Sequence, residues 1–376
     1  MKVISPEFVK DKIVFLRLDI DVPIGESDKS DKSEDQSVGG SNGLVVLDDF
    51  RLKAGLPTLN MCLENAQKVI IMGHIGRPEG KKVPELSVAP ILDWLEQNID
   101  HCFLDEEKLF LLENLRFESG EEEASVDFAK EIISMVSPTG SENCVFVNEA
   151  FASYHQAASI TILPTLLPSA AGLKFAQEVK KLTQIRETPL HPLLFIMGGA
   201  KVEDKMPVVQ EMAKIADAVL VGGKIAGELR ISEEQNIRIS ERKTTSDSDS
   251  SDLPVFRSSG IPHNVFVGTL NKTGEDMTSE TIASWENLVK GARMIVWNGP
   301  IGKIEESGSA EGTYKLAQMI ADSSAQVIVG GGDTVGFLGQ VDLLDKFENI
   351  GFVSTGGGAM LKFLETGTLP SIEALK

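Results

Sequence analysis

Short runs of aliphatic and β-branched residues recur along the chain, and each run ends abruptly in polar residues or glycine. Continuous apolar runs are typical of strands that are buried on both faces of a parallel sheet. Stretches between them, such as 203–216 and 312–322, show the helical spacing of apolar positions. The alternation of strands and helices predicts an α/β fold. We expect strands at 13–18, 69–72, 109–112, 144–147 and 160–163, and then at 193–197, 218–221, 294–297, 326–329 and 352–354.

The two halves of the chain end their strands differently, with charged residues in the first half and glycine in the second. This difference favours two parallel sheets, each covered by helices, over the alternative of a single (β/α)8 barrel. The length of 376 residues also suggests two domains, at roughly 100–200 residues per domain.

Two segments, 26–43 and 244–252, consist almost entirely of polar residues and glycine. Neither can bury enough apolar area to offset the entropy of ordering, so we predict that both are solvated loops.

The charge balance excludes one class of partner. There are 36 Lys and Arg residues against 56 Asp and Glu, a formal net charge of −20, which argues against a general nucleic-acid binder. Three scattered cysteines (Cys62, Cys102 and Cys144) are typical of a reduced, cytoplasmic protein. No apolar run approaches the ~20 residues that cross a bilayer. We therefore expect no nucleic-acid partner and no membrane, and a local basic pocket for anionic small molecules remains possible.

Glycine follows each predicted strand of the second half. Ligands of open α/β sheets bind beyond the carboxyl ends of the strands, and glycine there lets the backbone approach a phosphate closely. Tight turns are the alternative explanation for one such loop, but five loops at one sheet edge favour phosphate binding. Neither a P-loop nor a dinucleotide-binding fingerprint is present. The loops lie at 198–199, 222–223, 298–300, 330–332 and 355–358.

Three charged residues accompany these glycines. Asp333 follows one loop, where a carboxylate beside phosphates needs a cation, so Mg²⁺ is the natural partner; a helix N-cap is the alternative. Lys201 and Lys205 are spaced to project from one face of a helix start, which favours phosphate binding over a solvated lysine pair. The second half therefore predicts a nucleotide site.

Charged residues follow the strands of the first half instead. Arginine suits carboxylate and phosphate because its planar fork can form two parallel hydrogen bonds. Each residue alone could be a surface charge, and each histidine could be structural, but together they predict a site for a small anion. Two such domains suggest hinge closure around a phosphoryl transfer. The residues that follow strands are Asp19, Asp21, His74, Arg77, Arg116, Asn148, Glu149 and His155, and Arg51 follows the first solvated loop.

Seven segments resemble the motifs of the phosphoglycerate kinase family, in its order and approximate spacing: RLDIDVP, GHIGRP, LLENLRF, GGAKVEDK, IVWNGP, GGGD and VSTGGGA. The resemblance covers nearly the whole chain. It implies two Rossmann-like α/β domains joined by a hinge helix, in a cytoplasmic monomer. It also implies reversible glycolytic phosphoryl transfer between 1,3-bisphosphoglycerate and ADP–Mg²⁺, giving 3-phosphoglycerate and ATP. The implied domains are 1–168 for 3-phosphoglycerate, with 359–376 packing back on it, 169–190 as the hinge helix, and 191–358 for the nucleotide.

The resemblance also implies roles for individual residues. Arg51, Lys201 and Gly357 match residues that contact the transferred phosphoryl group, Glu305 matches a ribose contact, and Asp333 matches the Mg²⁺ ligand. The implied 3-phosphoglycerate site contains Asp19, Asp21, Arg51, His74, Arg77, Arg116 and Gln156. The implied nucleotide site contains Gly199, Lys201, Lys205, Gly223, Asn298, Glu305, Gly331, Gly332, Asp333 and Thr334. The implied phosphoryl-transfer loop contains Thr355, Gly356, Gly357 and Gly358.

The chain departs from the family pattern at several positions. Asp21 replaces Asn, and Gln156 replaces an arginine that contacts the substrate phosphate. Glu149 replaces Asp, Ala158 replaces a second His, and Lys224 stands in a glycine motif. Losing one charge-assisted contact costs about 1.5–3 kcal/mol, which weakens an enzyme without abolishing it. The alternatives to an active enzyme of this family are a degenerate paralogue that binds nucleotide with little turnover, and a related kinase for a different acid.

Overall fold

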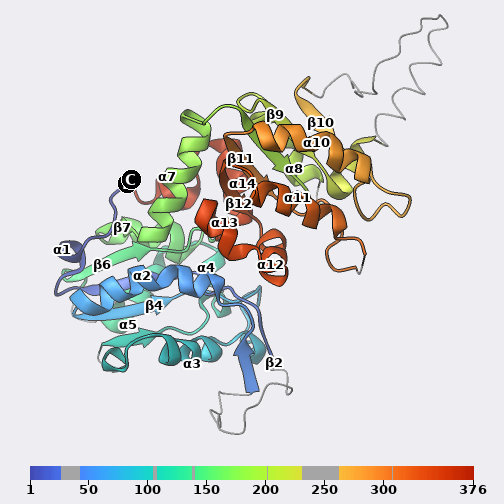
Figure 1. Ribbon diagram of the computed structural model, residues 1–376. Helices are drawn as coiled ribbons and strands as arrows, with labels where there is room; N and C mark the ends of the chain where they lie inside the picture. The colour runs from blue at the N-terminus through green and yellow to red at the C-terminus, as the bar shows by residue number, and fades with distance from the viewer. Residues whose placement is uncertain (27–42, 105–107, 138–139, 201, 231–261, 307) are drawn as a thin grey trace, which may run out of the picture. The chain divides into compact units, whose positions relative to one another are not determined.

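The computed structural model describes residues 1–26, 43–104, 108–137, 140–200, 202–230, 262–306 and 308–376. Nearly all of the two predicted solvated loops, and Lys201, lie outside these ranges. The chain forms two compact units, one of Met1–Lys180 with Thr368–Lys376 and the other of Lys181–Gly367 (Figure 1). Two separate sheets confirm the predicted fold class, and the single-barrel alternative is wrong.

The first unit contains a five-stranded sheet in the order β5-β4-β1-β6-β7, with every pair parallel. β1 lies in the centre, and four of its five residues are buried, as the apolar run predicts. A two-stranded antiparallel ribbon, β2 with β3, accompanies this sheet. The strands are β1 (Ile13–Arg17), β2 (Ile24–Glu26), β3 (Leu44–Val46), β4 (Lys68–Met72), β5 (Leu109–Leu111), β6 (Cys144–Asn148) and β7 (Ser169–Ala171).

One predicted strand of this unit is wrong. Residues 160–163 belong to the π-helical turn η6 (Ala158–Ile162) and to α6 (Leu163–Leu166), and the fifth strand is β7 instead. The N–H groups of Ile160 and Thr161 both donate to the carbonyl of Ala157, at 3.1 and 2.9 Å, which winds this segment into a turn. A short apolar run looks the same in a buried strand and in a buried helical turn.

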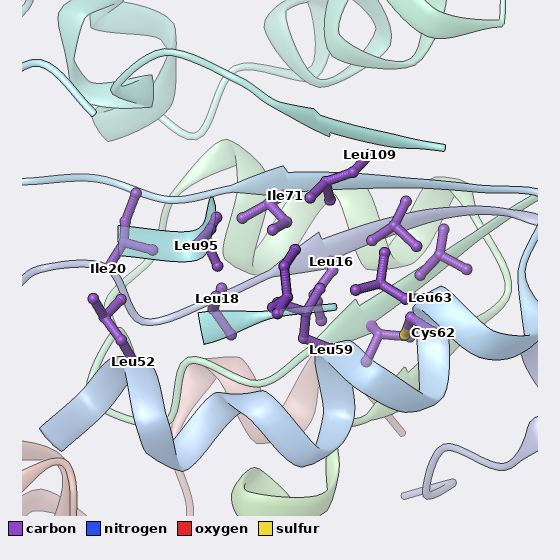
Figure 2. Close-up of a cluster of buried hydrophobic side chains, with 14 of the residues drawn as sticks. Leu16, Leu18, Ile20, Leu52, Leu59, Cys62, Leu63, Ile71, Leu95 and Leu109 are labelled. Atoms are coloured by element: carbon purple, nitrogen blue, oxygen red, sulfur yellow. The ribbon is translucent and has the colours of Figure 1, made fainter. Parts of the chain in front are cut away.

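Helices cover both faces of the first sheet. α2 (Phe50–Asn65) and α3 (Ala89–Asn98) contribute to one apolar cluster with alternate residues of β1 and β4 (Figure 2). α2 packs so closely that a Cβ on Gly55 would lie 2.4 Å from Leu18 Cδ1. Phe15, on the opposite face of β1, is also fully buried. The remaining helices are α1 (Pro6–Val9), η3 (Pro84–Leu86), η4 (His101–Phe103), η5 (Leu115–Phe117), α4 (Ser119–Glu122), α5 (Val126–Val136) and α15 (Pro370–Glu373).

The second unit contains a six-stranded, wholly parallel sheet in the order β10-β9-β8-β11-β12-β13. Five strands match the predicted runs, and the sixth, β10 at the sheet edge, is not predicted; only the first of its three residues is buried. The strands are β8 (Leu193–Met197), β9 (Ala218–Val221), β10 (Val265–Val267), β11 (Met294–Asn298), β12 (Gln326–Gly330) and β13 (Gly351–Val353). The helices are α8 (Val202–Met212), α10 (Ser279–Gly291), α11 (Glu311–Ala321), α12 (Gly332–Gln340), α13 (Leu344–Ile350) and α14 (Gly357–Thr366).

The segments that link the units differ from the expected boundaries. α7 (Leu173–Glu187) carries the chain from the first unit into the second, but it is shorter than the expected 169–190 because 169–171 form β7. The tail that joins the first unit begins at Thr368 rather than at 359, because α14 packs on α8 within the second unit. No helix in the described ranges combines the length and the apolar character that a membrane span requires.

Candidate functional site

The first unit gathers charged side chains where its parallel strands end. Asp19 and Asp21 follow β1, His74 follows β4, and Arg116 lies in η5 after β5. Arg51 lies in the first turn of α2. Because parallel strands end at one edge of the sheet, these residues come from distant segments to the same edge, as the sequence predicts.

Asp19 orients Arg51. The Arg51 guanidinium donates from Nη1 to the backbone carbonyl of Asp21 at 2.9 Å, and the same nitrogen lies 3.6 Å from Asp19 Oδ1. Asp19 is buried, and within the described residues neither of its carboxylate oxygens has a hydrogen bond. Burial raises the pKa of Asp19, while the charges of Arg51 and Arg17 oppose that rise. A buried carboxylate beside the guanidinium therefore holds Arg51 at this edge while its side chain stays partly exposed.

Asp21 supports the loop that carries His74. Its Oδ1 accepts from the N–H of Gly76 at 2.9 Å, and its Oδ2 lies 3.7 Å from His74 Nε2. Arg116 donates from Nη1 to the Gly76 carbonyl at 2.8 Å, so the backbone of Gly76 is held at both its N–H and its carbonyl. Gly76 adopts a φ of +62°, a conformation that favours glycine. The departure from Asn at position 21 thus places a carboxylate where it accepts from backbone and faces an imidazole.

Arginines surround His74. Burial first, and then the positive charges of Arg17, Arg116, Arg51 and Arg77, together lower the pKa of His74 to about 2. The pKa of His155 is also lowered, by burial and then by Arg116 and Arg77. His74 is therefore neutral at physiological pH, and arginines supply positive charge at this edge.

Arg17 is a residue that the sequence reasoning missed. It ends β1, it is 1% exposed, and its Nη2 lies 2.6 Å from His74 Nδ1. The signal was present, because an arginine stands inside an apolar run predicted to be buried on both faces. A charged residue in such a strand is almost never fully buried without partners.

Gln156 follows His155 in the segment after β6. It is exposed and lines a cavity of about 460 Å³ with Thr161 and residues of the tail that begins at Thr368. None of the arginines around His74 lines this cavity. His155, next to Gln156, lies within electrostatic reach of Arg116 and Arg77.

In the second unit, three glycine-rich loops meet. The N–H groups of Gly198 and Gly199 donate to the carbonyls of Asn298 and Pro300 at 2.9 and 2.8 Å, and that of Gly223 donates to Ile301 at 3.1 Å. Lys205 of α8 donates from Nζ to the Gly198 carbonyl. The loops after β8, β9 and β11 therefore form one surface of backbone groups, and the ammonium group of Lys205 lies beside it.

Two helix N-termini lie beside this surface. α12 begins after Gly331, which has a φ of +104°, and α14 begins after Gly356. A Cβ on Gly357 would lie 2.3 Å from the Gly331 Cα, so only glycine permits this approach. Asn298 donates from Nδ2 to the Gly357 carbonyl at 3.3 Å, and Thr334 accepts from the Gly299 N–H at 3.0 Å. Unpaired N–H groups at helix starts favour an anion there.

The other candidate residues of the second unit are mostly exposed. Asp333 lies exposed in the first turn of α12, and because the N-cap is Gly331, the N-cap alternative for Asp333 is wrong. Glu305 lies exposed between β11 and α11, and Thr355 is buried before α14. Lys224 pairs with Glu228 at 3.9 Å and is exposed. No cluster of three or more His, Cys, Asp or Glu side chains within the described ranges could hold a metal by itself.

Comparison with known proteins adds independent findings. The sequence matches the phosphoglycerate kinase family over residues 5–254 and 262–367. A phosphoglycerate kinase from Solibacter usitatus is 32% identical over 402 residues, covering 98% of this chain and 97% of that protein. One from Borreliella burgdorferi is 32% identical over 372 residues, covering 88% and 92% respectively.

Solved structures agree with these relatives. The structure of phosphoglycerate kinase from Coxiella burnetii matches with a TM-score of 0.70 at 29% identity, covering 98% of this chain and 96% of that one. The structure from Pyrococcus horikoshii matches with a TM-score of 0.74 at 23% identity, covering 100% and 98%, a similarity of fold alone. Nothing in these comparisons favours a degenerate nucleotide-binding paralogue over an active enzyme. The chain therefore belongs to the phosphoglycerate kinase family and is a kinase that transfers a phosphoryl group.

Proposed function

We propose that the protein catalyses reversible phosphoryl transfer between 1,3-bisphosphoglycerate and ADP–Mg²⁺, giving 3-phosphoglycerate and ATP in glycolysis. The observation that carries this proposal is the arginine cluster around neutral His74 at the strand ends of the first unit. The protein acts as a cytoplasmic monomer.

The first unit binds 3-phosphoglycerate. Arg51, Arg77 and Arg116 supply positive charge, and His74 supplies a neutral hydrogen-bonding group. Asp19 and Asp21 hold Arg51 and the loop around Gly76, and Gln156 contacts the substrate more weakly than an arginine would. The acceptor carboxylate is already ionised at neutral pH, since carboxyl pKa values lie near ~4, so the reaction needs no general base.

The second unit binds the nucleotide. The starts of α12 and α14 supply backbone N–H groups, because those of the loops after β8 and β9 already donate to backbone carbonyls. Lys205 adds a positive charge beside Gly198. Lys201 and Arg51 neutralise the charge of the transferred group, and the loop before α14 holds that group through the N–H groups of its glycines. The nucleotide contacts are Gly199, Lys201, Lys205, Gly223, Asn298, Glu305, Gly331, Gly332, Asp333 and Thr334, and the transfer loop is Thr355, Gly356, Gly357 and Gly358.

Asp333 would hold the Mg²⁺ ion that accompanies the nucleotide. A single exposed carboxylate beside a phosphate-binding loop fits this ion, which is usually held by one or two carboxylates together with substrate phosphates. The bound ion would neutralise negative charge on the phosphate oxygens. On this assignment, the first unit is the 3-phosphoglycerate domain, the second is the nucleotide domain, and α7 is the hinge helix between them.

A coupled assay with 3-phosphoglycerate, ATP and Mg²⁺ tests the proposal. We expect turnover by the wild-type protein and a loss of at least ~100-fold in kcat for Lys201→Ala. Lys214→Ala is the matched control, since Lys214 is an exposed lysine of the same unit that pairs with nearby Glu211. A rate unaffected by Lys201→Ala would overturn the kinase assignment, and nucleotide binding without turnover would establish the degenerate paralogue.

A further inference from the structure

Arg17 is held rigidly inside the first unit. Its Nε donates to Ser159 Oγ at 3.0 Å and its Nη1 donates to the Leu18 carbonyl at 2.7 Å. Ser159 in turn donates from its hydroxyl to Glu121 Oε1 at 2.6 Å and from its backbone N–H to Oε2 at 3.0 Å. All three side chains are buried. The Glu121 carboxylate therefore fixes Ser159, and Ser159 fixes the Arg17 guanidinium. The remaining nitrogen of that guanidinium, Nη2, contacts His74.

The contact between Arg17 and His74 determines where the imidazole proton lies. A guanidinium carries only donors and stays protonated in proteins, so Nη2, 2.6 Å from His74 Nδ1, must donate to a lone pair there. If Nδ1 carried a proton, its N–H would point at the N–H of Arg17 Nη2, and the two donors would repel each other. A neutral imidazole has one N–H, and it must then lie on Nε2.

On the other side of the ring, the Nε2–H donates to none of the residues that the structure describes. Asp21 Oδ2 lies 3.7 Å from Nε2, which is too far for a hydrogen bond. The departure at position 21 suits this arrangement, because a carboxylate accepts only and therefore faces an N–H favourably. Burial and the neighbouring arginines keep the ring neutral by lowering its pKa to about 2.

We propose that Arg17 is a positioning residue that holds His74 as the neutral Nε2–H tautomer, so that His74 is a permanent hydrogen-bond donor to the anionic substrate. His74 then serves neither as a cation nor as a general acid or base. The role toward the substrate rests on the function proposed above, but the tautomer does not.

Nuclear magnetic resonance of the full chain, labelled with ¹⁵N-histidine, tests the tautomer directly. The signals of His74 are assigned by their loss in His74→Gln. We expect one tautomer, protonated at Nε2 and unprotonated at Nδ1, unchanged between about pH 5 and pH 8, the range in which free imidazole titrates. A proton on Nδ1, a mixture of tautomers, or an imidazolium in that range would overturn the proposal.

A pair of variants tests whether Arg17 is the cause. Arg17→Met with Glu121→Gln removes both buried charges together, and we expect the two tautomers of His74 to exchange. Arg77→Met is the matched control, since it removes a positive charge that acts on His74 without removing the contact at Nδ1. Loss of the single tautomer in the control, or its retention in the double variant, contradicts the role of Arg17. If the double variant does not fold, the wild-type spectrum still decides the tautomer.

Kinetics test the role of the donor. A glutamine side chain at position 74 can place an amide N–H where Nε2 lies, while an asparagine reaches only the position of Nδ1. We expect His74→Asn to raise KM for 3-phosphoglycerate by roughly 10–100-fold, His74→Gln by clearly less, and neither to change KM for ATP. The reverse order would refute the donor role. An Nε2–H tautomer without any turnover would instead refute the proposed function and leave the tautomer standing.

Discussion

Glu149 links the pH to the stability of the first unit. It is buried, and its carboxylate accepts from the Thr58 hydroxyl at 2.6 Å and from the N–H groups of Lys174 and Phe175 at 3.0 and 2.9 Å. These two N–H groups belong to the first turn of α7, so Glu149 supports the start of the helix that leads into the second unit. Replacement by glutamine keeps the shape of the side chain and removes its ability to ionise.

The size of the effect follows from the pKa. Burial raises the pKa of Glu149 from 4.5 to about 7, although the hydrogen bonds to Phe175, Thr58 and Lys174 act in the opposite direction. The native state therefore binds this proton more tightly than the unfolded chain does. Protonated Glu149 stabilises the native state fully below about pH 4.5, and this stabilisation is lost as the pH rises to about 7. Its total is about 3 kcal/mol, at 1.36 kcal/mol per pKa unit.

Urea unfolding of the wild type and of Glu149→Gln over this pH range measures the effect. We expect the free energy of unfolding of the wild type, minus that of the variant, to fall by about 3 kcal/mol between pH 4.5 and pH 7.5. Glu131→Gln, at an exposed position of α5, is the control, and its difference stays within about 0.5 kcal/mol. A difference for Glu149→Gln that is independent of pH, or that grows with pH, refutes the reasoning.

Two further predictions concern activity, and one concerns stability. Gln156→Arg lowers KM for 3-phosphoglycerate by roughly 10-fold and leaves KM for ATP unchanged in steady-state kinetics; an unchanged KM for the acid means that Gln156 does not face the substrate phosphate. Gly357→Ala forces a Cβ to within 2.3 Å of Gly331 and lowers Tm, whereas Gly358→Ala, whose Cβ would meet nothing within 4 Å, does not; equal Tm values for the two variants contradict the close approach. Chelation of Mg²⁺ abolishes turnover, and Asp333→Asn raises the Mg²⁺ concentration needed for half-maximal rate by at least ~10-fold; an unchanged requirement assigns the ion to other ligands.

The gathering of Asp21, His74 and Arg116 could be predicted from the sequence. The reason is geometric, because every parallel strand presents its carboxyl end at one edge of its sheet, whatever the precise strand boundaries are. The glycine loops of the second unit follow the same rule. The approach of Gly331 to Gly357 also shows why glycine is required there, since a side chain would displace backbone.

Other features depend on contacts that no local pattern contains. The helical turn at 160–163 and the edge strand β10 are short segments whose conformation is decided by the surrounding packing. Arg17 is conspicuous in the sequence, but its partner Ser159 lies 142 positions away, and only the fold brings them together. The sequence therefore predicts His74 as a candidate residue, but it does not predict the contact of His74 with Arg17.

The first unit consists of two separate segments of the chain, and this constrains the order in which the two units can fold during synthesis. Residues 368–376 belong to the first unit, yet the ribosome makes them after all of the second unit has been made. Leu369, Ile372 and Leu375 of this tail are buried, and α15 lies against η6. The second unit is continuous and can complete its core first, while the first unit must wait, with η6 uncovered, for these nine residues to emerge.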